Sequence, residues 1–116
     1  MVLSVPLHWI KRWLKGVNPA GQLAVTVARS LKKPYAPCAL RRRRWTATQT
    51  RLRWRERFRN VDQAFAARKQ FVTDKTVLLI DDVLTSGATA NACARALKRA
   101  GAKRVFVLTA ARTPLE

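Results

Sequence analysis

Two adjacent carboxylates, Asp81 and Asp82, follow the apolar run from Val77 to Ile80. Four apolar residues in a row are typical of a central parallel strand that is covered on both faces. Ligands of open α/β sheets bind at the carboxyl ends of such strands. Carboxylate oxygens accept hydrogen bonds from sugar hydroxyls and are ligands for Mg²⁺. The pair therefore predicts a ligand site at the end of this strand.

A short polar loop comes next and leads into a segment of helical character. It consists of Thr85, Ser86, Gly87, Ala88 and Thr89. Backbone N–H groups and hydroxyls at a helix N-terminus bind anions, most naturally a phosphate. The alternative is an ordinary strand and turn with polar caps, which we disfavour because two acids after a buried strand are costly without a task. No Gly-Lys-Ser/Thr follows the strand, so this is not a Walker A loop.

This stretch resembles the signature of the type I phosphoribosyltransferases, which bind 5-phosphoribosyl 1-pyrophosphate (PRPP). The resemblance implies that Asp81 and Asp82 are the catalytic and metal-binding residues, holding the ribose hydroxyls and the region of the Mg²⁺ ion. It also implies that residues 85–89 cradle the 5-phosphate. Purine-salvage relatives carry an Asp at the first loop position, where this chain has Thr85. The resemblance therefore disfavours a purine acceptor.

The remaining sequence resembles the phosphoribosyltransferase domain of the ComF family of competence proteins. The matching pieces, in the family's order, are residues 4–9, 16–18, 44–49, 57–60, 64–65 and 77–112. The resemblance implies an α/β fold with a mostly parallel sheet flanked by helices, as one domain over residues 1–116. It implies truncation at the N-terminus, because family members usually begin with a zinc ribbon. It also implies a role in DNA uptake, with a partner in the uptake machinery.

Residues 41–60 form a basic segment that the resemblance places at a mobile hood over the site. Such lids exclude water, which competes for the anomeric carbon of PRPP. Any of several arginines could neutralise pyrophosphate, and Gln49 and Asn60 are candidate polar contacts. The arginines are Arg44, Arg51, Arg53, Arg55 and Arg57.

The net charge of the chain is +18, from 24 Lys and Arg against 6 Asp and Glu. The electric field of such a chain attracts polyanions. The alternative is that the charge reflects an Arg-rich genome and has no functional meaning. Trp45 and Trp54 lie among the arginines of residues 41–60, a composition that suits single-stranded nucleic acid. Alternatively, these aromatic side chains pack the hood onto the core. Two hypotheses follow: a PRPP-binding transferase, and a non-catalytic protein that binds single-stranded nucleic acid.

Periodicity and turn residues predict the elements that position the site. We expect strands over residues 2–7, 35–40 and 105–110, the last of them buried, and a linker over residues 69–75. A helix should begin at Asn18-Pro19 and end near Lys32-Lys33. A second helix should begin at Thr89 or Ala90 and end at a Gly101 cap. The expected inward faces are Ala20, Leu23, Ala24, Val27, Ala28 and Leu31 in the first helix, and Ala92, Cys93, Ala96, Leu97 and Ala100 in the second.

Cys38 and Cys93 are far apart and form no CxxC pair, so neither a zinc site nor a disulfide framework is indicated. We expect both to be small core residues. No apolar run is long enough to span a bilayer. The sequence therefore predicts a cytoplasmic protein.

Overall fold

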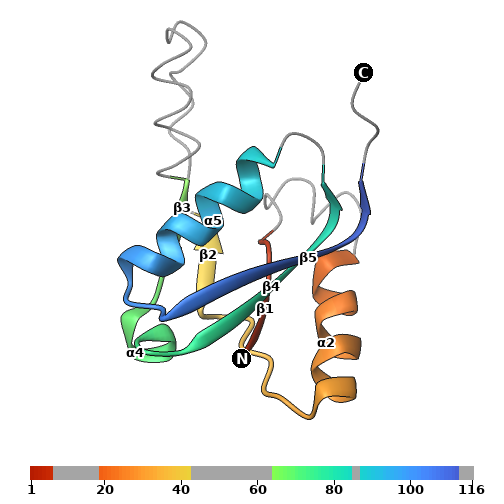
Figure 1. Cartoon of the computed structure of the whole chain (residues 1–116), viewed down its shortest axis with the longest axis horizontal. Coiled ribbons are helices and arrows are strands. Elements are labelled where there is room, and N and C mark those ends of the chain that lie inside the picture. Colours follow the sequence, from red (N-terminus) through yellow and green to blue (C-terminus); the bar gives the residue numbers. More distant parts are fainter. Residues whose placement is uncertain (7–18, 43–63, 85–86, 113–116) are drawn as a thin grey trace, which may run out of the picture.

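The computed structural model describes residues 1–6, 19–42, 64–84 and 87–112. Its centre is a three-stranded parallel sheet in the order β1-β4-β5, shown in Figure 1. The strands are β1 (Val2–Ser4), β4 (Thr76–Leu84) and β5 (Arg104–Arg112). Helix α2 packs on β1 and β4, whereas α5 packs on the opposite face of the sheet.

The central strand β4 is apolar and buried, as its sequence predicts. Val77, Leu79 and Ile80 are all fully buried. Pairing with β5 continues as far as Leu84, which lies opposite Arg112. The strand therefore does not stop at Asp81, as the sequence suggested, because backbone pairing carries it three residues beyond that carboxylate.

Helix α2 (Pro19–Leu31) begins at the predicted proline and ends one residue before Lys32, whose φ of 55° breaks the helix. Asn18, the expected N-cap, lies outside the described residues. Ala24 and Ala28 are buried against β1 and β4, so the small side chains let the helix approach the sheet closely. Leu31 was expected to face inward, but it is 52% exposed because it lies in the last turn, beyond the sheet.

All five predicted inward residues of the second helix are buried: four lie within α5 (Ala88–Arg99), and Ala100 is its C-cap. The helix begins one residue earlier than expected. At its end, Gly101 adopts φ 101°, its N–H donates to the carbonyl of Lys98, and the Ala102 N–H donates to the carbonyl of Leu97. This pair of bonds is a Schellman motif, which confirms the predicted glycine cap.

A small antiparallel pair lies on the α5 side of the molecule. It joins β2 (Leu40–Arg42) to β3 (Phe65–Ala67) and is followed by α4 (Lys69–Val72). The predicted strand over residues 35–40 is wrong, because only Tyr35 forms a bridge, with Val2, before the chain turns at Pro37. The predicted linker over residues 69–75 contains α4, which is too short to show a helical period in the sequence.

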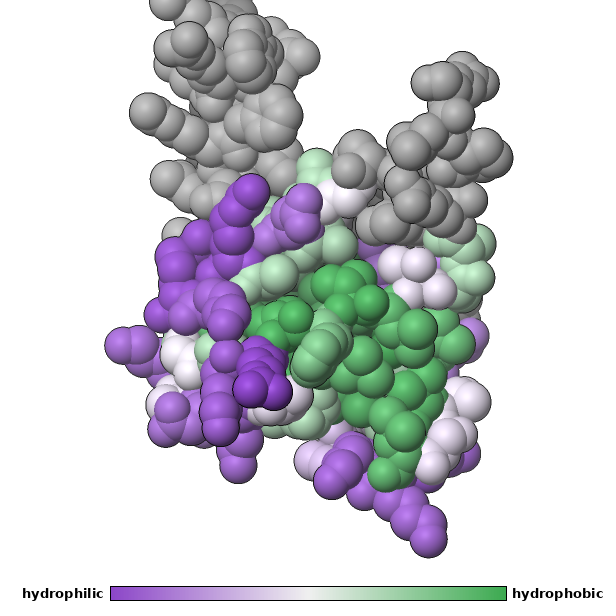
Figure 2. Space-filling view, viewed as in Figure 1, coloured by the Kyte–Doolittle hydropathy of each residue, from purple (hydrophilic) through white to green (hydrophobic). Residues whose placement is uncertain are grey.

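Strand β5 is not buried as predicted. Phe106 is 56% exposed, and Val107 and Leu108 are each 44% exposed. The reason is its position, since β5 is the last strand of the sheet and α2 packs on β1 and β4 instead. Figure 2 shows a broad hydrophobic area on the face where β5 lies in front. Cys38 is also exposed, contrary to expectation, whereas Cys93 is buried as expected.

Candidate functional site

Asp81 and Asp82 occupy the carboxyl-terminal third of the central strand. Asp81 is 9% exposed and Asp82 is half-buried. Successive residues of a strand point to opposite faces. Asp81 continues the row of Val77 and Leu79, which face α5, so Asp82 faces the side of α2. The structure thus brings the two predicted residues to the same end of β4, where their side chains interact with each other.

Asp81 fixes the backbone between the two acids. The Asp82 N–H donates to Asp81 Oδ1 over 2.9 Å. Burial raises the pKa of Asp81 to about 6, and its interaction with Asp82 adds to the shift. A buried carboxylate is costly unless donors or a cation stabilise it. The ionised form of Asp81 is therefore poised to gain from a cation at this end of the strand.

On the α5 side, Cys93 lies within electrostatic range of both Asp81 and Arg42. Burial raises the pKa of the Cys93 thiol, and the negative charge of Asp81 raises it further, whereas Arg42 opposes the shift. The Arg42 guanidinium lies over the Phe65 ring, 5.4 Å from its centroid. Burial lowers the pKa of Arg42, and its buried Nε finds no hydrogen-bond acceptor among the described residues.

Sequence reasoning missed Arg42, because it searched for the functional cation later in the basic segment. Strand alternation places Arg42 inward, but only once the start of the three-residue strand β2 is known. Leu40 is buried and Arg41 is exposed, so residue 42 returns to the inner face of β2. An arginine at an inward position of a strand is usually paired with an anionic group of the protein or of a ligand.

Helix α5 is preceded by a residue in a left-handed backbone conformation, which glycine adopts more easily than other residues. Gly87 has φ 83°, in the left-handed region, and its carbonyl accepts the N–H of Asn91 over 2.9 Å. Ala88 and the exposed Thr89 form the first turn of α5. The predicted phosphate-loop residues Thr85 and Ser86 lie outside the described residues. The described part places the N-terminus of a 12-residue helix directly after the acidic end of β4.

The donor set fits magnesium. Two adjacent carboxylates supply hard oxygen atoms, and Mg²⁺ is usually held by one or two carboxylates together with water and substrate phosphates. The residues that the structure describes contain no group of three or more His, Cys, Asp or Glu that could hold an ion by themselves. An ion at Asp81 and Asp82 would thus complete its coordination with ligand and water oxygens.

Several predicted contacts lie outside the described residues. They are Gln49, Asn60 and the arginines of residues 44–57. Within the described ranges, no helix has the length and apolar character needed to cross a membrane.

Comparison with known families decides the class of the domain. The family model named "Phosphoribosyl transferase domain" matches residues 15–114. The chain belongs to this family. The phosphoribosyl transferase match includes β4, its carboxylates and the whole of α5, so the site described above lies inside the region that defines the family.

Two curated relatives of this phosphoribosyl transferase domain are named for competence and for DNA utilization. Competence protein F of Haemophilus influenzae is 32% identical over 113 residues, covering 96% of this chain and 49% of that protein. DNA utilization protein YhgH of Escherichia coli K12 is 36% identical over 112 residues, covering 97% and 49%. The chain therefore spans about half the length of these relatives, and the predicted similarity to the ComF family is confirmed.

Solved structures confirm the fold. Glutamine PRPP amidotransferase from B. subtilis, complexed with ADP and GMP, superposes with a TM-score of 0.65 at 22% identity, covering 93% of this chain and 22% of that one. A structure described as the allosteric regulatory enzyme of purine biosynthesis gives 0.64 at 24% identity, covering 93% and 21%. The predicted α/β class, a parallel sheet flanked by helices, is therefore correct.

Proposed function

We propose that this domain binds PRPP with Mg²⁺ at the carboxyl end of β4. The observation that supports the proposal most directly is the succession, within a few residues, of Asp81, Asp82 and a helix N-terminus that begins at Gly87. Sugar hydroxyls and a magnesium ion need carboxylates, and a terminal phosphate needs backbone N–H groups. PRPP presents all three features on one small molecule.

The two acids have different parts in this proposal. Asp82 is half-buried and faces away from the α5 core, so it contacts the ribose hydroxyls. Asp81 is buried and holds the Asp82 N–H, so it positions the strand end and gives the ion a second carboxylate. Thr85, Ser86, Gly87, Ala88 and Thr89 bind the 5-phosphate.

The reaction that we propose is transfer of the phosphoribosyl group to a nitrogen nucleophile. A bond forms between the nitrogen and the anomeric carbon, and the bond from that carbon to pyrophosphate breaks, with the electron pair leaving on pyrophosphate. When bound, Mg²⁺ would neutralise charge on the leaving pyrophosphate. The protein contributes positioning and stabilisation of the positive charge that develops on the ribose, for which Asp81 and Asp82 are the catalytic residues.

Arg42 extends this proposal on the α5 side. Its guanidinium is half-buried, and its Nε has no hydrogen-bond acceptor among the described residues. It interacts electrostatically with Cys93, and the charge of Asp81 also raises the pKa of Cys93. An anionic ligand beside Asp81 would supply the missing acceptor. We propose that Arg42 contacts the pyrophosphate group, together with arginines of residues 44–57.

The names of the relatives suggest the biological setting. One relative is called a competence protein and another a DNA utilization protein. We propose that this domain acts in the uptake or use of DNA, together with other components of that machinery. The free thiols of Cys38 and Cys93 are compatible with the reducing cytoplasm, where we place the protein.

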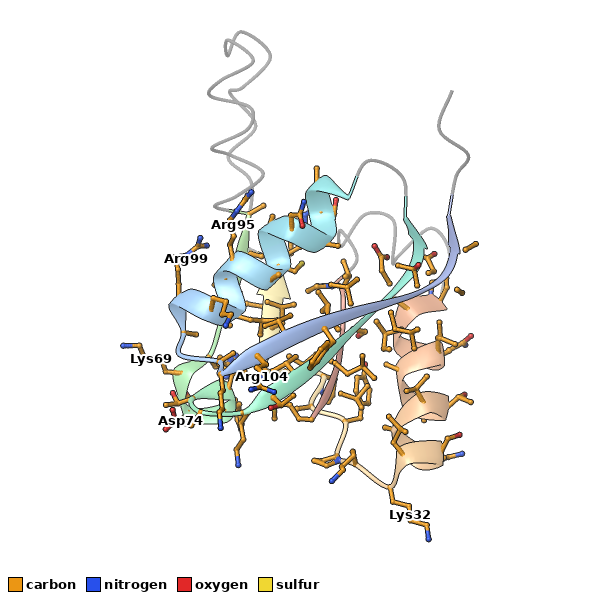
Figure 3. All side chains as sticks on the ribbon, in the orientation of Figure 1. Lys32, Lys69, Asp74, Arg95, Arg99 and Arg104 are labelled. Atoms are coloured by element: carbon orange, nitrogen blue, oxygen red, sulfur yellow. The ribbon has the colours of Figure 1, made fainter. Side chains whose placement is uncertain are left out.

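Calorimetric titration with PRPP and Mg²⁺ tests the proposal. Asp82→Asn should weaken binding by about tenfold or more, because it removes a charge-assisted contact. The matched control is Asp74→Asn. Asp74 precedes β4 at the far end of the sheet (Figure 3) and has φ 60°, a conformation that asparagine tolerates. This control should bind PRPP like the original protein.

Two results would sink the proposal. One is the absence of PRPP binding by protein that is shown to be folded by a cooperative thermal transition. The other is an equal loss of PRPP affinity in the Asp82→Asn and Asp74→Asn proteins. If binding is established, pyrophosphate release in the presence of nitrogen acceptors such as ammonia then tests the transfer reaction itself.

A further inference from the structure

Strand β5 has a row of exposed residues on the side of the sheet where α2 packs. Successive residues of a strand point to opposite faces, so every second residue shares one face. Phe106 lies beside Leu78 of β4, and Leu108 follows two residues further along the same face. Leu78 packs against the cluster that holds α2 on the sheet. The exposed residues on this face of β5, which we call the β5 row, are Arg104, Phe106, Leu108 and Ala110.

Helix α2 is too narrow to cover this row as well as its own strands. Strands lie about 4.8 Å apart and packed helices about 8–10 Å apart, so one helix covers about two strands. Helix α2 lies on β1 and β4, which leaves β5 uncovered (Figure 1). Parallel sheets usually have helices on both faces. The hydrophobic area in Figure 2, where β5 lies in front, therefore has room for one more helix beside α2.

The β5 row also has the length of a helix. From Arg104 to Ala110 it extends about 20 Å, at about 3.3 Å per residue of strand. A helix rises about 1.5 Å per residue, so about 13 residues would cover the row. Helix α2, which covers the neighbouring strands, has 13 residues. The uncovered area therefore matches one ordinary helix in both width and length.

The charges around the β5 row are all positive. Neither α2 nor β5 contains an Asp or a Glu. Arg104 begins the row, and the exposed Lys32 follows α2. Figure 3 labels both residues in the lower half of the view. A second copy of this chain would bring the same cations to the contact, and each copy has a net charge of +18. A partner with carboxylates fits this face better than a second copy does.

We infer that the β5 row is a docking site for an acidic amphipathic helix of a partner protein. An apolar stripe on that helix covers Phe106 and Leu108, and a carboxylate at the border of the stripe pairs with Arg104. The helix lies beside α2 and completes the covering of this face of the sheet. Docking does not depend on PRPP, because no member of the row belongs to the proposed PRPP site.

The test is fluorescence anisotropy with a labelled synthetic peptide of about 16 residues, long enough to form a helix on the protein. Its leucines follow the spacing of one helix face, and its other residues are Glu and Ala. A second peptide has the same composition in a scrambled order, so that its leucines share no face. Titrations are made at low salt, where charge repulsion opposes self-association, and analytical ultracentrifugation checks that the protein is monomeric.

Two double variants test the apolar contact. Phe106→Thr/Leu108→Thr removes the large side chains of the row and keeps residues that favour strands. The matched control, Phe71→Thr/Val107→Thr, removes exposed apolar side chains from α4 and from the opposite face of β5. The first variant should weaken binding of the helical peptide by about tenfold or more, because burial of two large side chains is lost. The control should keep the original affinity, and thermal unfolding checks that both proteins fold.

Two single variants test the charge at the end of the row. Arg104→Gln is compared with Arg41→Gln, which removes the same charge from an exposed residue of β2. Arg104→Gln should weaken binding by about twofold to fivefold, the effect of an exposed ion pair. The difference from the original protein should shrink at high salt, which screens such a pair. Arg41→Gln should bind like the original protein.

Several results would overturn the inference. They are absence of binding by the helical peptide, equal affinity for the two peptides, and equal losses in the two double variants. A dimer that Phe106→Thr/Leu108→Thr dissociates, without peptide binding, would assign the row to a second copy of the chain. Binding to phosphatidylserine vesicles that the same variant loses, again without peptide binding, would assign it to a lipid surface.

Discussion

The Asp81 carboxylate accepts the backbone N–H of the next residue, Asp82, over 2.9 Å. The bond ties the side chain that faces α5 to the peptide group of the residue that faces the other side of the sheet. A change of charge on Asp81 is therefore felt at the backbone of Asp82. This coupling makes pH a probe of the site.

Ionisation of Asp81 should destabilise the domain when no ligand is bound. Its pKa in the folded protein is raised to about 6, whereas an unfolded chain has the ordinary value near 4. Between these values the folded state holds more protons, so the contribution of Asp81 to stability is complete below about pH 4 and is lost as pH rises to about 6. Urea unfolding at pH 4 to 7 should show this fall in the original protein. The fall should be smaller in Asp81→Asn, and identical profiles would contradict the assignment.

The same shift predicts proton release on ligand binding. A bound cation lowers the pKa of a neighbouring carboxyl group. Binding of PRPP with Mg²⁺ near pH 6 should therefore release protons from Asp81. Calorimetry in two buffers of different ionisation enthalpy measures the release, and Asp81→Asn is the control for protons from the phosphates. A release of the same size in that variant would exclude Asp81 as its source.

The two cysteines should react at very different rates. Cys38 is exposed, whereas Cys93 is buried and its pKa is raised by burial and by Asp81. Because the thiolate is the reactive form, a thiol reagent should modify one site quickly and the other only on unfolding. Mass spectrometry over time checks this, and Cys38→Ser should remove the fast phase. Rapid modification of Cys93 in folded protein would show that α5 opens readily.

Gly101 should be more sensitive to substitution than Gly21. Gly101 has φ 101°, and a Cβ there would lie 3.4 Å from Thr73 Oγ1. Gly101→Ala should therefore cost about 1–2 kcal/mol in the free energy of unfolding, measured with urea. Gly21 lies inside α2, where alanine is the better helix former, so Gly21→Ala should add about 0.5–1 kcal/mol. Equal effects at the two positions would argue against the left-handed cap.

The exposed apolar side chains of β5 should promote self-association. An edge strand with exposed apolar residues is a surface on which chains aggregate. Charge repulsion opposes this in a chain of net charge +18, so association should increase with salt, which screens the charge. Light scattering should show a lower apparent mass for Phe106→Lys/Leu108→Lys. The control Leu31→Lys, on α2, should associate like the original protein, and equal behaviour of both variants would remove β5 as the cause.

Sequence reasoning succeeded where one element contains all the information. The inward face of α5 follows from its helical period, its end follows from Gly101, and the burial of β4 follows from four apolar residues in a row. The acidic pair and the loop from Thr85 to Thr89 were predicted as a site from a contiguous signature, and their binding role stays a prediction.

Sequence reasoning failed where the answer depends on neighbours. The run from Val105 shows that β5 is an apolar strand, but it does not show that β5 lies at the edge of the sheet and beyond the reach of α2. The inward position of Arg42 depends on the start of a three-residue strand, which no period can fix.

The pairing of β1 with β4 has a consequence for synthesis of the chain. Val2 lies beside Leu78 in the sheet, so during synthesis β1 waits for almost the whole intervening segment before its partner strand appears. The segment from β4 to β5 has short-range contacts and can assemble as soon as it emerges, whereas docking of β1 must close a long loop. During that delay Val2 and Leu3, fully buried in the finished domain, are open to chaperones and proteases.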